Sequence, residues 1–375
     1  MGSIGEAQVA NGCQRDVLGE GFECLTFDLG VDELLLDPDG RKKEKHDAAE
    51  GTGEEDHAPP QLAATLVRSL PKRGGAWSRL LGHWRDLEDV DVLYVHGWAD
   101  YFFQKDLARF WTGRGARFFA LDLRRYGRSL REQQTPGYIT NLADYDEEIE
   151  LAIDEIRSSA PKNTPSRKLV LFGHSTGGLI LSLWANRNPG VADALVLNSP
   201  WLEFQFSARV RQLIASIVHL GARVNPLEAA PQFDRGFYSR AQAEVGPHDE
   251  LEGVNLTWRP LQSHPVHGGW LSAIFDGHRQ VSEGLDVGAP VCVLLSARSA
   301  MPTRWSEDLI RADTVIEVDE VARAALHLGT SVTIEWIDGA LHDVFLSAPD
   351  PRADAYARLE RWVRGWRRSL HSKPR

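Results

Sequence analysis

Eight short runs of apolar residues, each bounded by polar residues or glycine, divide this sequence. The first two have the composition of strands and the other six are compact apolar runs: 22–30, 61–70, 89–97, 117–123, 168–173, 193–199, 290–296 and 331–337. A continuous apolar run of this length is typical of a strand that is buried on both faces of a sheet. The pattern therefore predicts a sheet that is covered on both sides.

Apolar residues at helical spacing fill the gaps between these runs. They occur at 106–111, at 141–159 with acidic residues on the outer face, and directly after Ser175. Strands that alternate with helices predict a parallel sheet with helices on both faces. A further apolar stripe predicts a last helix, formed by Leu359, Trp362, Val363, Trp366 and Leu370. We interpret the arginines beside this stripe as its solvated face rather than as a membrane-surface contact.

One region breaks the alternation and divides the chain. Residues 200–285 hold an amphipathic stretch and a Pro-, Trp- and Gly-rich passage but no clear strand. We predict a helical insertion there, between two parts of one core at 61–199 and 286–375. Residues 1–60 are predicted to be an N-terminal strand followed by a charged, flexible insertion, because the end of that segment has no apolar residue beyond alanine.

Composition narrows the class of protein. The chain has 375 residues, 42% of them hydrophobic and 12 of them Trp, which is enough for a large core. A formal charge of −11 argues against a nucleic-acid partner, because phosphate binding needs a basic surface. Cys13, Cys24 and Cys292 have neither paired nor metal-ligand spacing, so we expect reduced thiols in a cytoplasmic protein without a metal or cofactor. No apolar run is long enough for a membrane span.

The segment 173–177 reads Gly-His-Ser-Thr-Gly between a predicted strand and a predicted helix. A bare G-x-S-x-G pattern arises often by chance, and the glycines could simply mark a tight turn. The strand before it and the helix after it are the context that a nucleophile elbow requires. We therefore interpret Ser175 as a nucleophile that the turn holds above the sheet.

A serine nucleophile needs a base and an acid that orients the base. After an elbow of this kind, the expected order along the chain is serine, acid, histidine. His342 follows the last predicted strand and is the candidate base. The acid should follow the strand at 290–296, where we favour Asp313 over Asp308 and Asp319 because the segment around Asp313 resembles a loop that enters a helix.

Other residues near these positions receive supporting roles. His96 ends an early strand and His174 precedes the nucleophile, so both are expected to support the site. His327 falls inside a predicted helix, where a structural role is favoured. Asp343 is adjacent to the candidate base and is interpreted as a loop acid, because side chains of adjacent residues rarely meet.

An oxyanion hole needs two backbone N–H groups that point at the developing charge. One should come from Thr176, the residue after the nucleophile. The other should come from Trp98, which follows His96 and Gly97 at the end of a predicted strand. The alternative is that these residues only form the turn that closes the strand.

Four motifs together carry a family resemblance: VLYVHGWADY, ALDLRRYGRS, GHSTGG and GALHDV. Over about residues 60–370 the chain resembles the α/β-hydrolase superfamily, and within it the monoacylglycerol lipase, lysophospholipase and serine aminopeptidase-like group. The resemblance implies the α/β-hydrolase fold, with a mostly parallel central sheet and a helical cap inserted before the acid-bearing strand. It implies the same nucleophile, acid, base and oxyanion residues. It also implies that three residues form a structural turn, namely Asp122, Gly127 and Ser129.

Three features depart from the family pattern. Trp98 is bulky at a position where the lipase members usually have a smaller residue. The stretch between the strand at 290–296 and Asp313 is extended, and the charged insertion at 31–60 has no clear counterpart.

The resulting expectation is a serine esterase for monoacylglycerols, lysophospholipids or small apolar esters. Three aromatic residues near the start of the cap are candidates for contacting the substrate: Trp201, Phe204 and Phe206. A peptidase or amidase with the same triad is the alternative, with Glu203 or the region near Asp249 holding a free amino terminus. A non-catalytic ligand receptor on the same scaffold is a third reading, which an intact triad disfavours.

Overall fold

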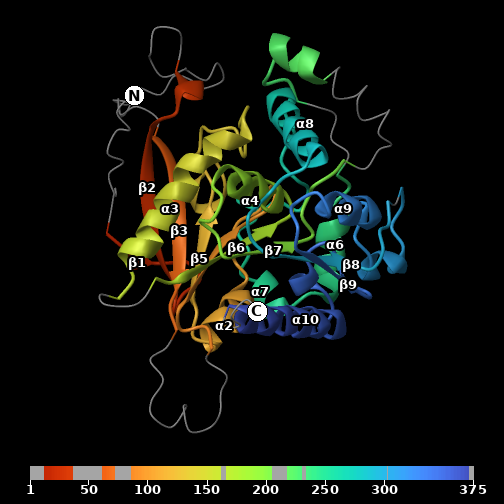
Figure 1. Ribbon diagram of the computed structural model, residues 1–375. Coiled ribbons are helices and arrows are strands. Elements are labelled where there is room, and N and C mark those ends of the chain that lie inside the picture. Colours follow the sequence, from red (N-terminus) through yellow and green to blue (C-terminus); the bar gives the residue numbers. More distant parts are fainter. Residues whose placement is uncertain are drawn as a thin grey trace.

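One mixed sheet forms the centre of the protein (Figure 1). The computed structural model describes residues 12–36, 61–71, 86–161, 166–204, 218–229, 234–301 and 303–370. Within these ranges nine strands pair in the order β1-β2-β3-β5-β4-β6-β7-β8-β9. Their bounds are β1 Gln14–Arg15, β2 Glu23–Val31, β3 Gln61–Ser69, β4 Val90–Val95, β5 Arg117–Asp122, β6 Lys168–His174, β7 Ala194–Asn198, β8 Val291–Ser296 and β9 Val332–Ile337.

The eight predicted strands are confirmed as β2 to β9, and only the two-residue β1 has no counterpart among the predictions. From β5 across β4, β6, β7 and β8 to β9, every neighbouring pair is parallel. The first strands instead pair antiparallel, β1 with β2, β2 with β3 and β3 with β5. The sheet is therefore mostly parallel with an antiparallel N-terminal side.

The helices follow the predicted alternation, with small differences at their ends. The longer helices and the short α7 span α2 Lys105–Gly113, α3 Asp146–Ser158, α4 Thr176–Arg187, α6 Phe237–Val245, α7 His248–Leu251, α8 Gly268–Glu283, α9 Val318–Ala325 and α10 Pro349–Ser369. Five 3₁₀ turns accompany them: η1 Glu33–Leu35, η2 Gly127–Ser129, η3 Leu142–Tyr145, η4 Glu307–Arg311 and η5 Val344–Leu346. The helix predicted at 141–159 thus begins as η3, and His327 lies just after α9 rather than inside a helix.

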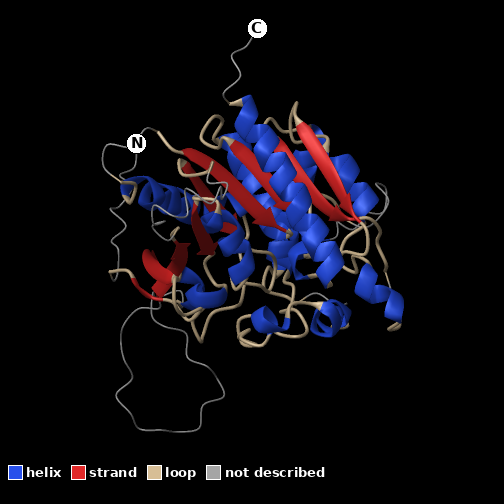
Figure 2. Ribbon diagram, turned by 90° about the horizontal axis from the view of Figure 1, so that it is seen from below, coloured by secondary structure: helices blue, strands red, loops and turns tan. Residues whose placement is uncertain are grey.

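Helices cover both faces of the sheet (Figures 1 and 2). Alternate residues of each strand point to opposite faces, so Leu93 and Val95 of β4 pack with α3, α4, α8 and α9. Val92 and Tyr94 of the same strand pack with α2 and α10. The arrangement is that of an α/β-hydrolase fold, and it explains why the parallel strands are apolar on both faces.

The chain between β7 and β8 departs from the alternation, as expected. Its described residues form α6, α7 and α8 together with a helical stretch at 218–224, and contain no strand longer than an isolated bridge. We call this part of the chain the β7–β8 insertion. Most of the predicted amphipathic stretch and the charged segment 37–60 lie outside the described residues.

The turn after β5 is fixed by a buried carboxylate. Asp122 accepts hydrogen bonds from the Phe102 N–H at 3.0 Å and from Arg128 Nη1 at 2.8 Å, and Ser129 Oγ donates to its backbone carbonyl at 2.7 Å. Gly127 has a φ of +47°, and a Cβ there would lie 2.5 Å from Asp122 Oδ2. These contacts agree with a structural role for the turn, and they anchor the loop that follows β4.

Candidate active site

Ser175 occupies a strained turn between β6 and α4. Its backbone has φ 51° and ψ −119°, which a residue with a side chain rarely adopts. The turn also leaves no room for side chains on either side. A Cβ on Gly173 would lie 2.6 Å from the Gly178 Cα, and one on Gly177 would lie 2.4 Å from the His96 carbonyl oxygen. The glycines of the motif are thus required by close backbone packing.

Backbone hydrogen bonds hold the turn in place. The Ser175 N–H donates to the Asn198 carbonyl at the end of β7, at 3.0 Å. The Ser175 carbonyl accepts from the N–H of Gly178 at 3.0 Å and of Trp201 at 2.9 Å. Because strain persists only where the surroundings determine the conformation, this network keeps Ser175 at its unusual angles.

The structure brings His342 and Asp313 together. His342 Nδ1 donates to Asp313 Oδ2 at 2.8 Å, and both side chains are buried. The other carboxylate oxygen accepts from the N–H of Val315 at 2.7 Å and of Ile316 at 2.9 Å. His342 Nε2 is buried and has no hydrogen-bond partner among the described residues. The imidazole therefore presents an unpaired nitrogen.

The competing acids lie elsewhere. The Asp308 side chain is 82% exposed and lies beside Arg298. Asp343 is fully buried, but its carboxylate accepts from the side chains of Gln104 and Asn198 and from the Phe345 N–H. Asp343 thus joins the β4 loop to the end of β7 and caps η5, a larger structural role than that of a simple loop acid.

Two further histidines surround the site. Burial lowers the pKa of His174, whose ring lies 5.1 Å from the ring of His342 and whose Nδ1 donates to the Asn198 carbonyl. His174 is therefore neutral at neutral pH and adds no positive charge beside His342. His96 accepts from the Leu123 N–H through Nε2 and donates to the Gly97 carbonyl through Nδ1 at 2.8 Å. It fixes the loop after β4.

Trp98 and Thr176, whose amides are predicted to form an oxyanion hole, both lie close to Ser175 along the chain or in space. Gly97 lies against Ser175, since a Cβ on Gly97 would be 3.0 Å from the Ser175 Cβ. Thr176 begins α4, so its N–H has no acceptor within the helix. No hydrogen bond of the described residues uses the N–H of Trp98 or Thr176, so among these residues neither amide has an acceptor.

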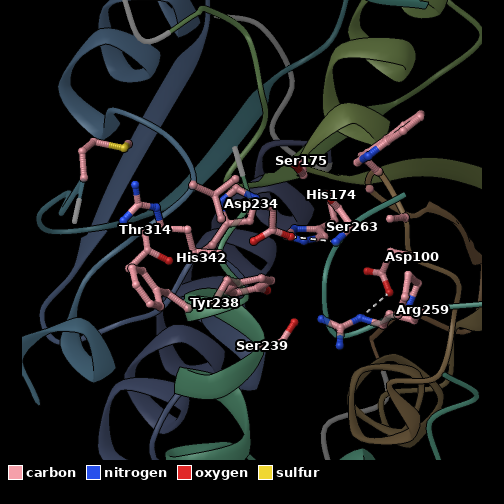
Figure 3. Close-up of a pocket in the computed structure, with 18 residues that line it drawn as sticks. Asp100, His174, Ser175, Asp234, Tyr238, Ser239, Arg259, Ser263, Thr314 and His342 are labelled. Atoms are coloured by element: carbon pink, nitrogen blue, oxygen red, sulfur yellow. Dashed lines mark hydrogen bonds and ion pairs between the residues drawn. The ribbon is translucent and has the colours of Figure 1, made fainter. Parts of the chain in front are cut away.

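Ser175 and His342 open into one cavity of about 430 Å³ (Figure 3). The core side of its wall includes Trp98, Asp100 and His174. The β7–β8 insertion supplies eight of the other lining residues: Asp234, Arg235, Phe237, Tyr238, Ser239, Arg259, Pro260 and Ser263. The cavity thus combines aromatic surface with several polar groups.

The described aromatic residues that the sequence suggested as substrate contacts are not found among the residues that line this cavity. Neither Trp201 nor Phe204 lines the cavity. The Trp201 ring lies 6.0 Å from Trp270, and the Phe204 ring lies 5.0 Å from Phe275, so both pack on α8. Phe206 lies outside the described residues. The rings of Trp201 and Phe204 thus pack the insertion on the core, and their contact with a substrate stays a prediction.

Sequence reasoning missed most residues of the cavity wall, among them Asp100, Tyr238 and Arg259. Asp100 could have been found, since it lies two residues after the expected oxyanion residue. Tyr238 and Arg259 come from the insertion, where no motif marks them. Among the described residues, no three His, Cys, Asp or Glu side chains gather as a metal site would require, and no helix has the length and apolar character to cross a membrane.

Comparison with solved structures identifies the fold. The fold matches the crystal structure of the Paleococcus ferrophilus monoacylglycerol lipase with a TM-score of 0.55 and 19% identity, over 80% of this chain and 99% of that one. It matches a soluble variant of Saccharomyces cerevisiae monoglyceride lipase with a TM-score of 0.56 and 15% identity, over 81% and 92% of the two chains. The protein therefore has the α/β-hydrolase fold.

Sequence comparison gives the more particular relationship. Residues 88–257 match the family model described as "Serine aminopeptidase, S33". Lysophospholipase L2 of Escherichia coli strain K12 is 32% identical over 122 residues, which are 31% of this chain and 32% of that protein. The similarity thus spans about a third of the curated relative.

Proposed function

We propose that this protein is a serine hydrolase that cleaves carboxylic esters through an acyl-enzyme intermediate. Ser175 is the nucleophile, His342 the base and Asp313 the acid, with the amides of Trp98 and Thr176 as oxyanion hole. One observation carries the proposal. The unpaired Nε2 of His342 and the strained Ser175 line the same cavity, while the other nitrogen of His342 is bonded to a buried carboxylate.

The geometry supports a two-step reaction. His342 Nε2 takes the proton of Ser175 Oγ as the oxygen bonds to the ester carbonyl carbon. The two amides stabilise the negative oxygen of the tetrahedral intermediate. The alcohol then leaves with the proton from His342, which gives the acyl-enzyme. Water, deprotonated by His342, attacks this ester and releases the carboxylic acid and free Ser175.

The proposed substrates are monoacylglycerols, lysophospholipids or small apolar esters. The names of the matched relatives, monoacylglycerol lipase and lysophospholipase L2, favour this group. Trp98 lines the cavity and supplies an apolar surface for an acyl chain. Polar side chains on the insertion are suited to the alcohol part. We also propose that residues 200–285 act as the cap over the site.

A peptidase or amidase with the same triad is the second candidate, since the matching family model is described as a serine aminopeptidase. Such an enzyme needs a carboxylate for the free amino terminus. Glu203 and Asp249 do not line the cavity. Asp100 and Asp234 do. Asp100 is paired with Arg259 at 2.8 Å, and the two oxygens of Asp234 accept the backbone N–H groups of Gly236 and Ser263, each at 2.7 Å. The ester reaction is therefore favoured.

The first test combines a covalent probe with two substrate series. We expect a fluorophosphonate probe to label Ser175 in the wild type and not in Ser175→Ala. We expect p-nitrophenyl esters of varied chain length to be hydrolysed much faster than aminoacyl anilides. Faster anilide cleavage would establish the amidase alternative. A protein that binds an apolar ligand but shows neither labelling nor turnover would be a receptor, and the proposal would be wrong.

The second test addresses the acid. Asp313→Asn removes the charge that orients His342 and should lower kcat by about 10⁴-fold. Asp308→Asn is the matched control and should retain wild-type activity, because its side chain is exposed. Equal activity of Asp313→Asn and the wild type would disprove the assignment of Asp313.

A further inference from the structure

A continuous line of side chains in the β7–β8 insertion connects the two loops of the proposed catalytic machinery. Arg259 Nε donates to Asp100 at 2.8 Å, and Arg259 Nη2 donates to Gln242 Oε1 at 2.6 Å. Gln242 Nε2 donates to the Tyr238 hydroxyl at 2.7 Å. That hydroxyl also accepts the backbone N–H of Asp343 at 3.2 Å. We call Asp100, Arg259, Gln242 and Tyr238 the bridging chain.

One end of the bridging chain holds the loop after β4. Asp100 lies two residues after Trp98, whose amide belongs to the proposed oxyanion hole. Two other contacts join the insertion to this loop. The Asn255 N–H donates to the Tyr101 hydroxyl at 2.8 Å, and the Trp258 ring lies edge-on to the Tyr101 ring, with centroids 5.2 Å apart. The insertion therefore clamps consecutive residues of this loop.

The other end holds the loop that carries the base. The Tyr238 ring meets the His342 ring edge-on, with centroids 5.5 Å apart and planes at 82° (Figure 3). Its hydroxyl is bonded to the backbone of the next residue, Asp343. Burial raises the pKa of Tyr238 well above its usual value, so the phenol keeps its proton. Tyr238 thus contacts both the ring of His342 and the backbone beside it.

The members of the bridging chain are buried or half-buried and complement one another. Gln242 is 1% exposed, and the Arg259 and Asp100 side chains are 11% and 8% exposed. Gln242 accepts from the guanidinium and donates to the phenol, so its amide has one orientation that satisfies both neighbours. A buried polar network of this kind specifies a single arrangement, because a broken member leaves another polar group without its partner.

We propose that the bridging chain positions the oxyanion loop and the base loop relative to each other, so that the insertion sets the catalytic geometry as well as covering the site. Tyr238, Gln242 and Arg259 are then positioning residues for turnover. The inference rests on the proposed ester hydrolysis. If the insertion positions the catalytic loops, changes in it should lower kcat. If it only covers the site, they should affect mainly KM.

The test uses three conservative variants in the full-length protein. Tyr238→Phe removes the hydroxyl and keeps the ring, Gln242→Leu removes both hydrogen bonds at similar volume, and Arg259→Lys keeps the charge but cannot reach two partners. With active sites counted by fluorophosphonate titration, we expect kcat per titrated site to fall about 10- to 100-fold, because small displacements of catalytic groups have effects of this size. KM should change far less.

A double-mutant cycle separates positioning from general damage. If Tyr238 and Arg259 act through one chain, the loss in Tyr238→Phe/Arg259→Lys should be clearly smaller than the product of the single losses. Arg240→Gln is the matched control, because Arg240 is on the same helix and pairs with exposed Glu244; it should keep wild-type kcat. Thermal unfolding of each variant shows whether it remains folded at the assay temperature.

The outcomes distinguish this inference from the proposed function. If the wild type is neither labelled nor active on esters, the proposed function fails. If the wild type is active and the folded variants keep its kcat, or if their losses multiply independently, the bridging chain has no positioning role and the inference is wrong.

Discussion

Ser175 sits on a turn whose neighbouring glycines leave no room for a Cβ atom. At Gly177 the obstructing atoms are backbone carbonyl oxygens of β4 and of the loop after it, which cannot rotate away. At Gly97 the nearest atom is the Ser175 Cβ itself, at 3.0 Å. The position of Ser175 is therefore determined by how closely three backbone segments approach one another.

Gly177→Ala tests this dependence on packing. We expect the free energy of unfolding to fall by about 1–3 kcal/mol, the cost of overpacking a filled site, and fluorophosphonate labelling to slow. Gly365→Ala is the matched control, because Gly365 is exposed in α10 and a Cβ there meets nothing within 4 Å. It should raise stability by about 0.5–1 kcal/mol. Chemical denaturation measures both, and similar effects would contradict the packing argument.

The candidate catalytic residues could be predicted because each lies next to a strong local pattern. Ser175 follows a buried strand and begins a helix, and His342 follows the last strand. Asp313 could only be favoured over Asp308, because the segment after β8 is long and the choice depends on how it folds back. Arg259 and Gln242 could not be predicted, since their importance comes from partners far away along the chain.

At the scale of elements, helix α2 depends on a neighbour for its N-terminus. Gln104, at its N-cap position, makes no cap hydrogen bond and points to Asp343 instead. Glu250 of α7 accepts the Asp106 N–H at 2.5 Å in its place. Burial raises the pKa of Glu250 to about 7, with further contributions from Asp106, Asp249 and Asp343. The insertion thus caps a core helix with a titrating group.

The raised pKa of Glu250 makes the free energy of unfolding depend on pH. The pKa of Glu250 is higher in the folded protein than the ordinary value near 4.5, so the folded state binds the proton more tightly. Its contribution to stability is complete below pH of about 4.5 and is lost as the pH rises through about 7. The loss is at most about 3 kcal/mol.

Glu250→Gln keeps an acceptor for the Asp106 N–H and removes the charge. We expect this variant to be more stable than the wild type at pH 8 and to lack part of the decline between pH 5 and pH 8. Urea denaturation at several pH values measures the difference. Glu252→Gln, at an exposed position two residues away, is the control; an equal gain there would mean that general charge repulsion, and not Glu250, is responsible.

Some helices and strands could be predicted from the sequence more precisely than others, and the reason is physical. The parallel strands β4 to β9 are buried on both faces and therefore appear as continuous apolar runs. The pairing of β2 and β3 on the antiparallel side is not a local property, and β1 has two exposed residues that carry no pattern. The helices of the insertion were located only as a region, because their contacts are made with distant loops.

At the scale of the whole molecule, a buried arginine connects parts of the chain that are distant in sequence. Arg128 pairs with Asp16 at 2.6 Å and with Asp122 at 2.8 Å, and it donates to the Phe102 carbonyl at 3.0 Å. The side chains of Arg128, Asp16 and Asp122 are at most 5% exposed. The N-terminal segment, the loop after β4 and the turn after β5 therefore share one charged centre.

Removing this centre should affect the entire fold. Arg128→Leu leaves two buried carboxylates without their counterion and should lower the free energy of unfolding by about 3–5 kcal/mol. Arg68→Leu is the comparison, because its partner Glu23 is 51% exposed and such surface pairs contribute at most about 1 kcal/mol. Denaturation curves for the two variants should differ accordingly, and equal losses would show that Arg128 is not a structural centre.

The close contact between the tilted rings of Trp98 and Trp270 has an optical consequence. One indole belongs to the loop after β4 and the other to α8 of the insertion, and their ring centroids are only 3.9 Å apart. Two indoles this close couple their electronic transitions and give a paired positive and negative band in the far-ultraviolet circular dichroism spectrum. A movement of the insertion away from the loop would abolish that band, so the protein carries its own reporter of opening.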